Sequence, residues 1–237
     1  MRLDKLLCDM GAGSRSQVKQ MIRKGLVTVD GEPVRRPEEQ VEKEQRVCVE
    51  GKSFSYVDLE YYMLYKPAGC VSACTDKRCQ TVLDLIPDRK RKDLFPVGRL
   101  DKDTEGLLLI TNDGKLAHFL LSPRRHVDKT YKVRVRGELT KDHVEAFREG
   151  LDIGEERPTL PALLKIHTSG EISEAEVTIR EGKYHQVKRM FQAVGCEVLY
   201  LKRISMGSLR LDESLRPGEY RALTKEELLG LQKEIEV

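Results

Sequence analysis

The chain has 237 residues, of which 34% are charged and 39% hydrophobic, a balance typical of soluble globular proteins. No apolar run approaches the roughly 18 residues of a membrane-spanning helix, and no secretory leader is recognisable, so we expect neither a membrane protein nor a secreted one. Six scattered cysteines are too sparse for a disulfide scaffold and favour a reducing cytoplasm. The length favours one small and one large domain.

Two short helices are predicted at the N-terminus. Between Leu3 and Met10 the apolar side chains follow the i, i+3, i+4, i+7 spacing of an amphipathic helix, which a Gly-Ala-Gly turn ends. Ser14 and Gln17 have the spacing of a capping box at the start of a second helix. Gly25 stands where that helix should end.

The same region is locally basic, although the formal net charge of the whole chain is only +3. Residues 1–36 hold eight lysines and arginines against four acidic residues. Arg15, Lys19 and Arg23 recur every four residues, so they share one face of the second helix and form a stripe suited to a phosphate backbone. The alternative interpretation is a charged face that is merely solvated.

The rest of the chain divides near residue 58. Valine-rich strands at 27–34 and 47–49 complete a small domain over residues 1–58, with a flexible hinge expected at 53–58. Over residues 59–237, strand-like runs alternate with helical stretches, which predicts a larger, mainly antiparallel domain and an α+β fold. The expected strands are 61–65, 107–111, 131–135, 175–179 and 198–201, the expected helices are 116–121 and 141–150, and the basic run 89–92 is interpreted as a solvated loop.

A polar loop with the sequence GRLDKDTEG, residues 98–106, lies directly before an apolar strand, where functional residues often lie. Its acids match the first positions of a calcium-binding EF-hand loop, but the last ligand position holds Asn112 instead of glutamate. A surface turn in which Arg99 pairs with Asp103 is the structural alternative. Zinc is disfavoured because no familiar ligand spacing fits the nearby cysteines, Cys70, Cys74 and Cys79.

Four segments together resemble the pseudouridine synthases. The loop at 98–106 is similar to the motif of the essential aspartate, and Lys66-Pro67-x-Gly69 resembles an earlier motif. Lys129-Thr130-Tyr131 resembles the motif of the active-site tyrosine, and EGKYHQVKRM at 181–190 the late basic motif. The wording of the last motif is most similar to the RsuA group, which modifies 16S ribosomal RNA. Residues 1–31 resemble the RNA-binding module named after ribosomal protein S4.

The resemblance implies a role for each site residue. Breaking the bond between uracil N1 and ribose C1′ and rejoining the base through C5 is an isomerisation, for which we expect no metal and no cofactor. Asp101 supplies the ionised carboxylate, which either attacks C1′ or abstracts a ribose proton. Tyr131 stacks on the uracil and takes the C5 proton, while Lys188 pairs with Asp101 or contacts a phosphate. Arg99 either fills the space of the displaced base or binds a neighbouring phosphate, and Leu201 packs under the base. The remaining candidates are the RNA contacts Lys183, Arg189, Arg2, Lys5, Arg15, Lys19 and Arg23.

The sequence therefore predicts a site-specific pseudouridine synthase. Its expected partner is ribosomal RNA, with the 16S molecule favoured, either free or in a partly assembled small-subunit particle, and the enzyme is expected to be a monomer. Two alternatives remain open, an enzyme that modifies 23S ribosomal RNA and a catalytically silent RNA-binding or ribosome-assembly factor. The combination of Asp101, Tyr131 and Lys188 favours the enzyme.

Overall fold

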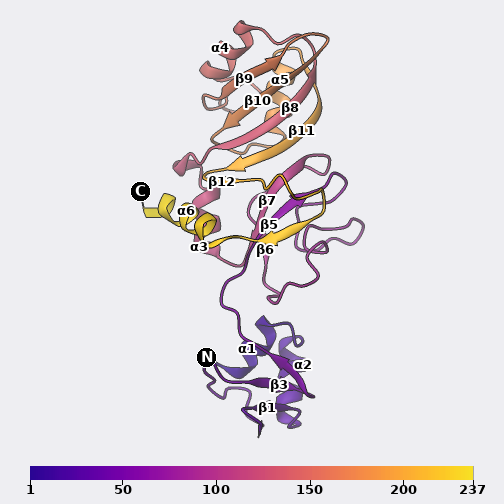
Figure 1. Ribbon diagram of the computed structural model, residues 1–237, viewed down its shortest axis with the longest axis vertical. Coiled ribbons are helices and arrows are strands. Elements are labelled where there is room, and N and C mark those ends of the chain that lie inside the picture. The colour runs from indigo at the N-terminus through magenta and orange to yellow at the C-terminus, as the bar shows by residue number, and fades with distance from the viewer. Residues whose placement is uncertain (237) are drawn as a thin grey trace. The chain divides into compact units, whose positions relative to one another are not determined.

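The computed structural model describes residues 1–236, which form two compact units (Figure 1). The N-terminal unit consists of residues 1–60 together with 87–94, and the C-terminal unit consists of 61–86 together with the chain from residue 95 onward. The segment 87–94 thus returns to the first unit after the chain has entered the second. Among residues 1–236, no helix is long and apolar enough to cross a membrane.

The N-terminal unit contains the two predicted helices and a four-stranded antiparallel sheet in the order β2-β1-β3-β4. The capping box is present, because the Ser14 hydroxyl accepts a hydrogen bond from the Gln17 amide and the Gln17 side chain returns one to Ser14. Buried apolar residues of both helices pack against the valines of the sheet. The elements are α1 (Leu3–Asp9), α2 (Arg15–Arg23), β1 (Val27–Val29), β2 (Glu32–Val34), β3 (Val47–Val49) and β4 (Lys52–Phe54).

The hinge expected at residues 53–58 is partly occupied by regular structure. Strand β4 pairs with β3, with Ser53 opposite Cys48, and Phe54 and Tyr56 pack against the core of the N-terminal unit. The prediction of a flexible linker at the start of this segment was therefore wrong. The segment lies at the predicted boundary between the two domains, where the sequence changes character, whereas its pairing with β3 follows from the tight turn at Glu50 and Gly51, both of which have positive φ.

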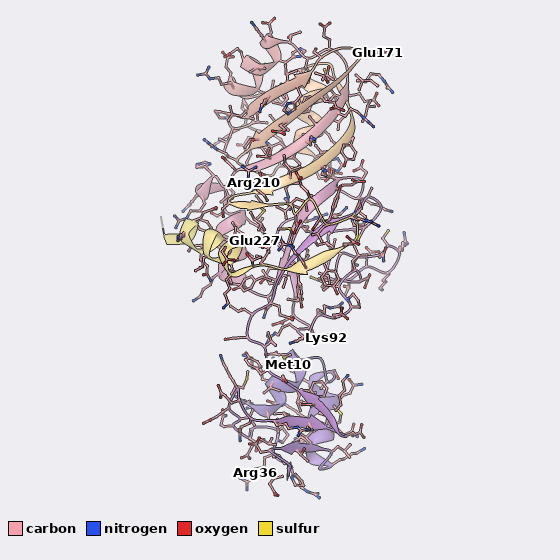
Figure 2. The ribbon with its side chains drawn as sticks, in the orientation of Figure 1. Met10, Arg36, Lys92, Glu171, Arg210 and Glu227 are labelled. Carbon is pink, nitrogen blue, oxygen red and sulfur yellow. The ribbon has the colours of Figure 1, made fainter. Side chains whose placement is uncertain are left out.

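Arg91 makes the segment 87–94 part of the N-terminal unit. Its side chain is 5% exposed, and its guanidinium lies 2.6 Å from the Asp93 carboxylate and 3.4 Å from that of Asp9. It also donates to the Val57 carbonyl at 3.1 Å. Figure 2 shows Lys92 close to Met10, and the Lys92 amide donates to the Asp9 carbonyl at 3.0 Å. At Arg91, the interpretation of the basic run as a solvated loop was wrong.

The C-terminal unit is built on one mixed sheet with the strand order β13-β5-β7-β11-β8-β10-β9, to which β12 and β6 add at β11 and β7. Strands β7 and β11 run parallel, and the other paired strands run antiparallel, so the predicted α+β class is confirmed. The strands are β5 (Tyr61–Lys66), β6 (Phe95–Pro96), β7 (Glu105–Thr111), β8 (Lys129–Arg136), β9 (Leu163–Thr168), β10 (Ile172–Ile179), β11 (Glu197–Met206), β12 (Leu209–Arg210) and β13 (Tyr220–Ala222). The helices are α3 (Gly114–Leu121), α4 (Lys141–Glu149), α5 (Gln186–Ala193) and α6 (Lys225–Glu236), with a 3₁₀ turn at Pro123–Arg125.

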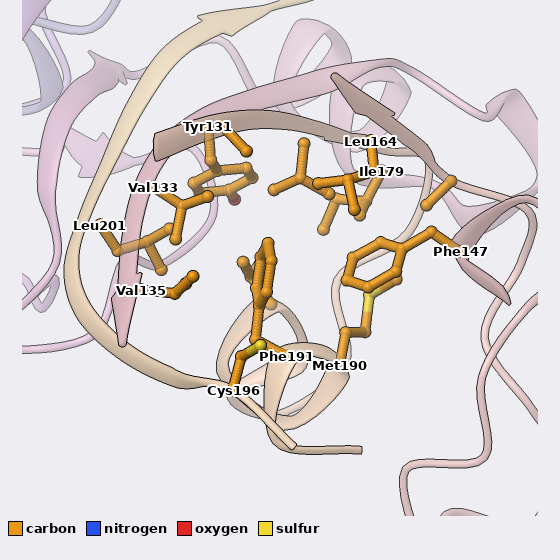
Figure 3. Close-up of a cluster of buried hydrophobic side chains, with 14 of the residues drawn as sticks. Tyr131, Val133, Val135, Phe147, Leu164, Ile179, Met190, Phe191, Cys196 and Leu201 are labelled. Atoms are coloured by element: carbon orange, nitrogen blue, oxygen red, sulfur yellow. The ribbon is translucent and has the colours of Figure 1, made fainter. Parts of the chain in front are cut away.

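Two apolar cores support this sheet. In one, side chains of β8, β10 and β11 pack against α4 and α5, and Figure 3 shows Tyr131 and Leu201 pointing from their strands toward Phe191 of α5. In the other, β5 and β7 pack with α3 and α6. The first core holds α5 over the strands that carry Tyr131 and Leu201, so it fixes the distance between the late basic motif and the sheet.

Gly106 is required where β7 and β11 meet. It has a φ of +106°, and a Cβ at this position would lie 2.2 Å from the Arg203 carbonyl oxygen of β11. The parallel pairing places Arg203 directly opposite Gly106. Any other residue here would push β7 and β11 apart at the start of β7, where the polar loop ends.

Candidate active site

The loop that carries Asp101 runs from β6 into β7 and is held by a buried lysine. Lys66, at the end of β5, is 0% exposed. Its ammonium donates to the carbonyls of Pro67 at 3.0 Å, Lys102 at 3.3 Å and Thr104 at 2.9 Å. Burial lowers the pKa of Lys66. The three carbonyls satisfy all three donors of the ammonium, so the early motif acts as a support for the loop.

The segment that follows Lys66 holds the same loop at two more points. The Gly69 amide donates to the Lys102 carbonyl at 2.7 Å. The Ser72 hydroxyl donates to the Leu100 carbonyl at 2.9 Å and accepts from the Leu100 amide at 3.1 Å. Asp101 therefore lies between Leu100 and Lys102, whose backbones are both held by hydrogen bonds. These bonds fix the position from which the Asp101 side chain extends.

Two basic side chains flank the Asp101 carboxylate. Oδ2 lies 3.4 Å from Nζ of Lys188, and Oδ1 lies 3.5 Å from Nε2 of His185. Lys188 is closer still to Asp103, at 2.6 Å, and this contact lowers the pKa of Asp103. Lys188 thus divides its charge between two carboxylates of the loop. Asp103 pairs with Lys188 and not with Arg99, the partner that the structural alternative gave it.

A cavity of about 80 Å³ opens beside Asp101. Tyr131 of β8 and Leu201 of β11 line it, and Lys188 reaches it from α5. Tyr131 is 7% exposed and Leu201 5%, whereas the Asp101 carboxylate is 29% exposed. The structure therefore brings together Asp101, Tyr131, Lys188, Leu201 and the exposed Arg99 around one hollow.

His185 is a site residue to which the sequence interpretation gave no role. It has a φ of +48°, which is uncommon for a residue with a side chain, and it directly precedes α5. Its imidazole stacks on the ring of Tyr184, with 3.8 Å between the centroids, and Tyr184 is 72% exposed. Membership of the EGKYHQVKRM motif was the one signal available for His185, since the left-handed backbone that turns its side chain toward Asp101 leaves no trace in local periodicity.

Lys183 and Arg189, the candidate phosphate ligands of the late motif, both form hydrogen bonds within the protein. The Lys183 ammonium donates to the carbonyls of Arg157 at 2.7 Å and Pro158 at 2.9 Å. Arg189 pairs with Glu155 and also donates to the backbone carbonyls of Ile153 and Tyr184. Both side chains therefore tie loop 153–158 to the late motif, and a phosphate contact would have to compete with these bonds.

The candidate RNA contacts of the N-terminal unit lie mostly around one shallow pocket. Its volume is about 300 Å³. The Arg2 guanidinium makes a two-point contact with Asp4, at 3.0 and 2.9 Å, which lowers the pKa of that carboxyl. Arg23 is exposed on α2 outside this pocket. The lining residues are Arg2, Asp4, Lys5, Arg15 and Lys19.

The side chains considered as metal ligands do not gather. Cys70 is buried, Cys74 exposed and Cys79 half-buried, and Cys79 accepts a hydrogen bond from the Lys102 ammonium at 3.4 Å. Within residues 1–236, no three His, Cys, Asp or Glu side chains form a group that could hold a metal ion. The cavity is lined by the Asp101 carboxylate, which lies near Lys188 and His185, and by the ring of Tyr131.

Comparisons with known proteins identify the family. A model of the RNA pseudouridylate synthases matches residues 60–193, and the S4 domain matches residues 1–48. The chain therefore belongs to the RNA pseudouridylate synthase family. Within it the chain is of the RsuA type with an N-terminal S4 domain, as the motifs predicted.

Full-length relatives agree with this assignment. Ribosomal small subunit pseudouridine synthase A of Escherichia coli is 41% identical, over 98% of this chain and 100% of its own length. The enzyme of the same name from Vibrio cholerae is 43% identical over the same shares. An uncharacterized RNA pseudouridine synthase of Bacillus subtilis is 49% identical, over 96% of this chain and 97% of its own. A crystal structure of a pseudouridylate synthase matches with a TM-score of 0.69 and 38% identity, covering 98% of this chain and 99% of that one.

Proposed function

We propose that this pseudouridine synthase modifies one uridine of 16S ribosomal RNA and that Asp101 is its essential carboxylate. The observation that carries the proposal is the position of Asp101 at the mouth of the cavity, between Lys188 at 3.4 Å and His185 at 3.5 Å. Relatives of the same length are named for the small ribosomal subunit, which supports the choice of RNA. Either route to C1′ requires a carboxylate, and the side chain of Asp101 supplies one beside the cavity.

The other cavity residues suit the remaining steps of the isomerisation. The uracil must leave its stack, and the ring of Tyr131 together with the Leu201 side chain offers apolar surface on which a displaced base can rest. The Tyr131 hydroxyl is the group we assign to the C5 proton after the new carbon–carbon bond forms. Arg99, exposed at the rim, fills the space vacated in the RNA or contacts a phosphate.

We assign RNA docking to the basic pocket of the N-terminal unit. Arg2, Lys5, Arg15 and Lys19 surround it, and Arg23 extends the row along α2. A patch of positive charge attracts a phosphate backbone without reading its sequence, so it supplies affinity while the cavity supplies the choice of nucleotide. The substrate is either free 16S RNA or a partly assembled small-subunit particle.

The test compares the wild-type protein with two aspartate variants. Each protein is incubated with unmodified small-subunit RNA, free or bound to ribosomal proteins, and pseudouridine is mapped by carbodiimide labelling. We expect one labelled uridine with wild type and none with Asp101→Asn, which keeps the shape but removes the charge. Asp142→Asn, at an exposed position of α4 in the same unit, is the control and should keep the modification.

The alternatives predict different results in the same assay. Labelling of large-subunit RNA instead would move the target to 23S RNA. Binding without labelling of any RNA would replace the enzyme by an RNA-binding or assembly factor. Full activity of Asp101→Asn would remove that residue from the mechanism while leaving the target assignment intact.

A further inference from the structure

The backbone of Thr104, in the Asp101 loop, makes two hydrogen bonds, yet its side-chain hydroxyl makes none within the described part of the chain. Its amide donates to the Asp101 carbonyl at 3.1 Å, and its carbonyl accepts from the Lys66 ammonium at 2.9 Å. The side chain is 1% exposed, and Oγ1 has no hydrogen-bond partner among the described residues 1–236. A buried hydroxyl without a partner costs free energy, so its presence needs an explanation.

The other buried threonines do not share this property. The Thr81 hydroxyl bonds to the Asp84 carboxylate at 2.9 Å, Thr111 accepts from the Asp113 amide at 3.0 Å, and Thr159 accepts from the Leu151 amide at 2.9 Å. Each of these hydroxyls stabilises a turn or a loop. An isosteric valine at position 104 would avoid the cost and keep every backbone bond, so the folded protein itself gains nothing from the Thr104 hydroxyl.

The position of Thr104 points to the missing partner. Thr104 lines the cavity together with Asp101, Tyr131 and Leu201. A nucleotide that enters this cavity brings polar groups next to a hydroxyl that can donate as well as accept. Oγ1 is shielded from solvent in this structure, and we expect it to meet the nucleotide by rotation about the Cα–Cβ bond.

We propose that the Thr104 hydroxyl binds a polar group of the target nucleotide, either the ribose 2′-hydroxyl or the uracil edge. This inference rests on the proposed function, since it needs the target uridine to occupy the cavity. Thr104 is then a specificity residue, because a nucleotide that lacks the matching group leaves the buried hydroxyl unpaired. The unpaired hydroxyl of the empty enzyme is thereby reserved for the substrate.

The test uses valine in place of threonine, which keeps the shape and removes the hydroxyl. For Thr104→Val we expect unchanged or higher resistance to denaturant together with a roughly tenfold lower kcat/KM on the RNA substrate. Thr104→Ser, which restores the hydroxyl, should recover most of the activity. Thr111→Val, at the end of the strand β7 that follows Thr104, is the matched control. It should behave in the opposite way, with lower stability and an unchanged kcat/KM, because its hydroxyl supports the Asp113 turn.

Two RNAs separate the possible partners. Kd is measured for wild type and Thr104→Val with an RNA carrying uridine or 2′-deoxyuridine at the target. If the 2′-hydroxyl is the partner, the valine variant loses affinity on uridine alone; if the uracil edge is the partner, it loses equally on both. Wild-type activity and affinity in Thr104→Val would overturn this inference by itself. Inactivity of the wild-type protein on every RNA would overturn the proposed function, and this inference with it.

Discussion

Lys129, the first residue of the strand that carries Tyr131, is an unusual buried cation. It is 8% exposed, and its ammonium donates to the Val127 carbonyl at 3.0 Å. Burial, together with the positive charge of Arg203, lowers the pKa of Lys129 to about 8. The charged form is therefore disfavoured in the folded protein relative to the unfolded chain.

This shift predicts a pH dependence of stability with a definite sign. Folded Lys129 releases its proton near pH 8, whereas the unfolded residue keeps it to about pH 10.5, so between these values the unfolded state binds more protons. The free energy of unfolding of wild type should rise over this window relative to Lys129→Met, as measured by denaturant titration at several pH values. Lys132→Met, at an exposed position of the same strand, is the control. Parallel curves for wild type and Lys129→Met would contradict the shift.

At the level of single residues, family motifs predicted more of the site than local pattern did. Asp101, Tyr131 and Lys188 come from three distant segments, and no periodicity relates them. The roles of Lys66 and Ser72 as supports of the loop could not be predicted, because they depend on contacts with backbone carbonyls more than 25 residues away, in a loop that lies opposite them through tertiary folding. The double pairing of Lys188 with Asp101 and Asp103 has the same origin.

Among the elements, helices and strands with strong apolar spacing were predicted well. Both N-terminal helices, α3, α4 and the five expected strands of the larger domain are present within a few residues of their predicted bounds. Helix α5 was not predicted, although Val187, Met190 and Phe191 are buried with helical spacing, and Lys188 and Arg189 interrupt the apolar residues along its sequence. Strand β9 was missed because it is an edge strand, largely exposed, with weak alternation.

The basic row on α2 leads to a prediction for that element. If Lys19 and Arg23 each contact a phosphate, replacing both by alanine should reduce the slope of log affinity against log salt by about 2 and leave the rate at saturating RNA largely intact. Filter binding at several salt concentrations measures this slope. The matched control is Arg46→Ala with Lys52→Ala, which removes the same charge from two exposed positions of the same unit, one directly before β3 and one at the start of β4. Equal slopes in the two double variants would contradict phosphate binding by Lys19 and Arg23 and would support a charged helix face that is merely solvated.

On the scale of the whole molecule, the contacts of Arg91 with Asp9 and Val57 attach residues 87–94 to the N-terminal unit. Removing its guanidinium leaves the Asp9 carboxylate, 19% exposed, without its cation and the Val57 carbonyl without a donor. We expect Arg91→Ala to cost about 2 kcal/mol of stability, confined to the N-terminal unit. Hydrogen exchange should become faster in residues 1–60 and 87–94 while the C-terminal unit keeps its protection. Lys90→Ala, at an exposed neighbour, should change neither.

Because residues 87–94 return to the first unit, the two units cannot be exchanged between proteins by a single junction. The chain passes between the units three times, after residues 60, 86 and 94, and not once as in a simple tandem of domains. A chimaera joined at residue 60 would therefore give Arg91 a foreign surface in place of Asp9 and Val57. We therefore expect that an engineered exchange of the N-terminal unit keeps its native contacts only if residues 1–60 and 87–94 are replaced together.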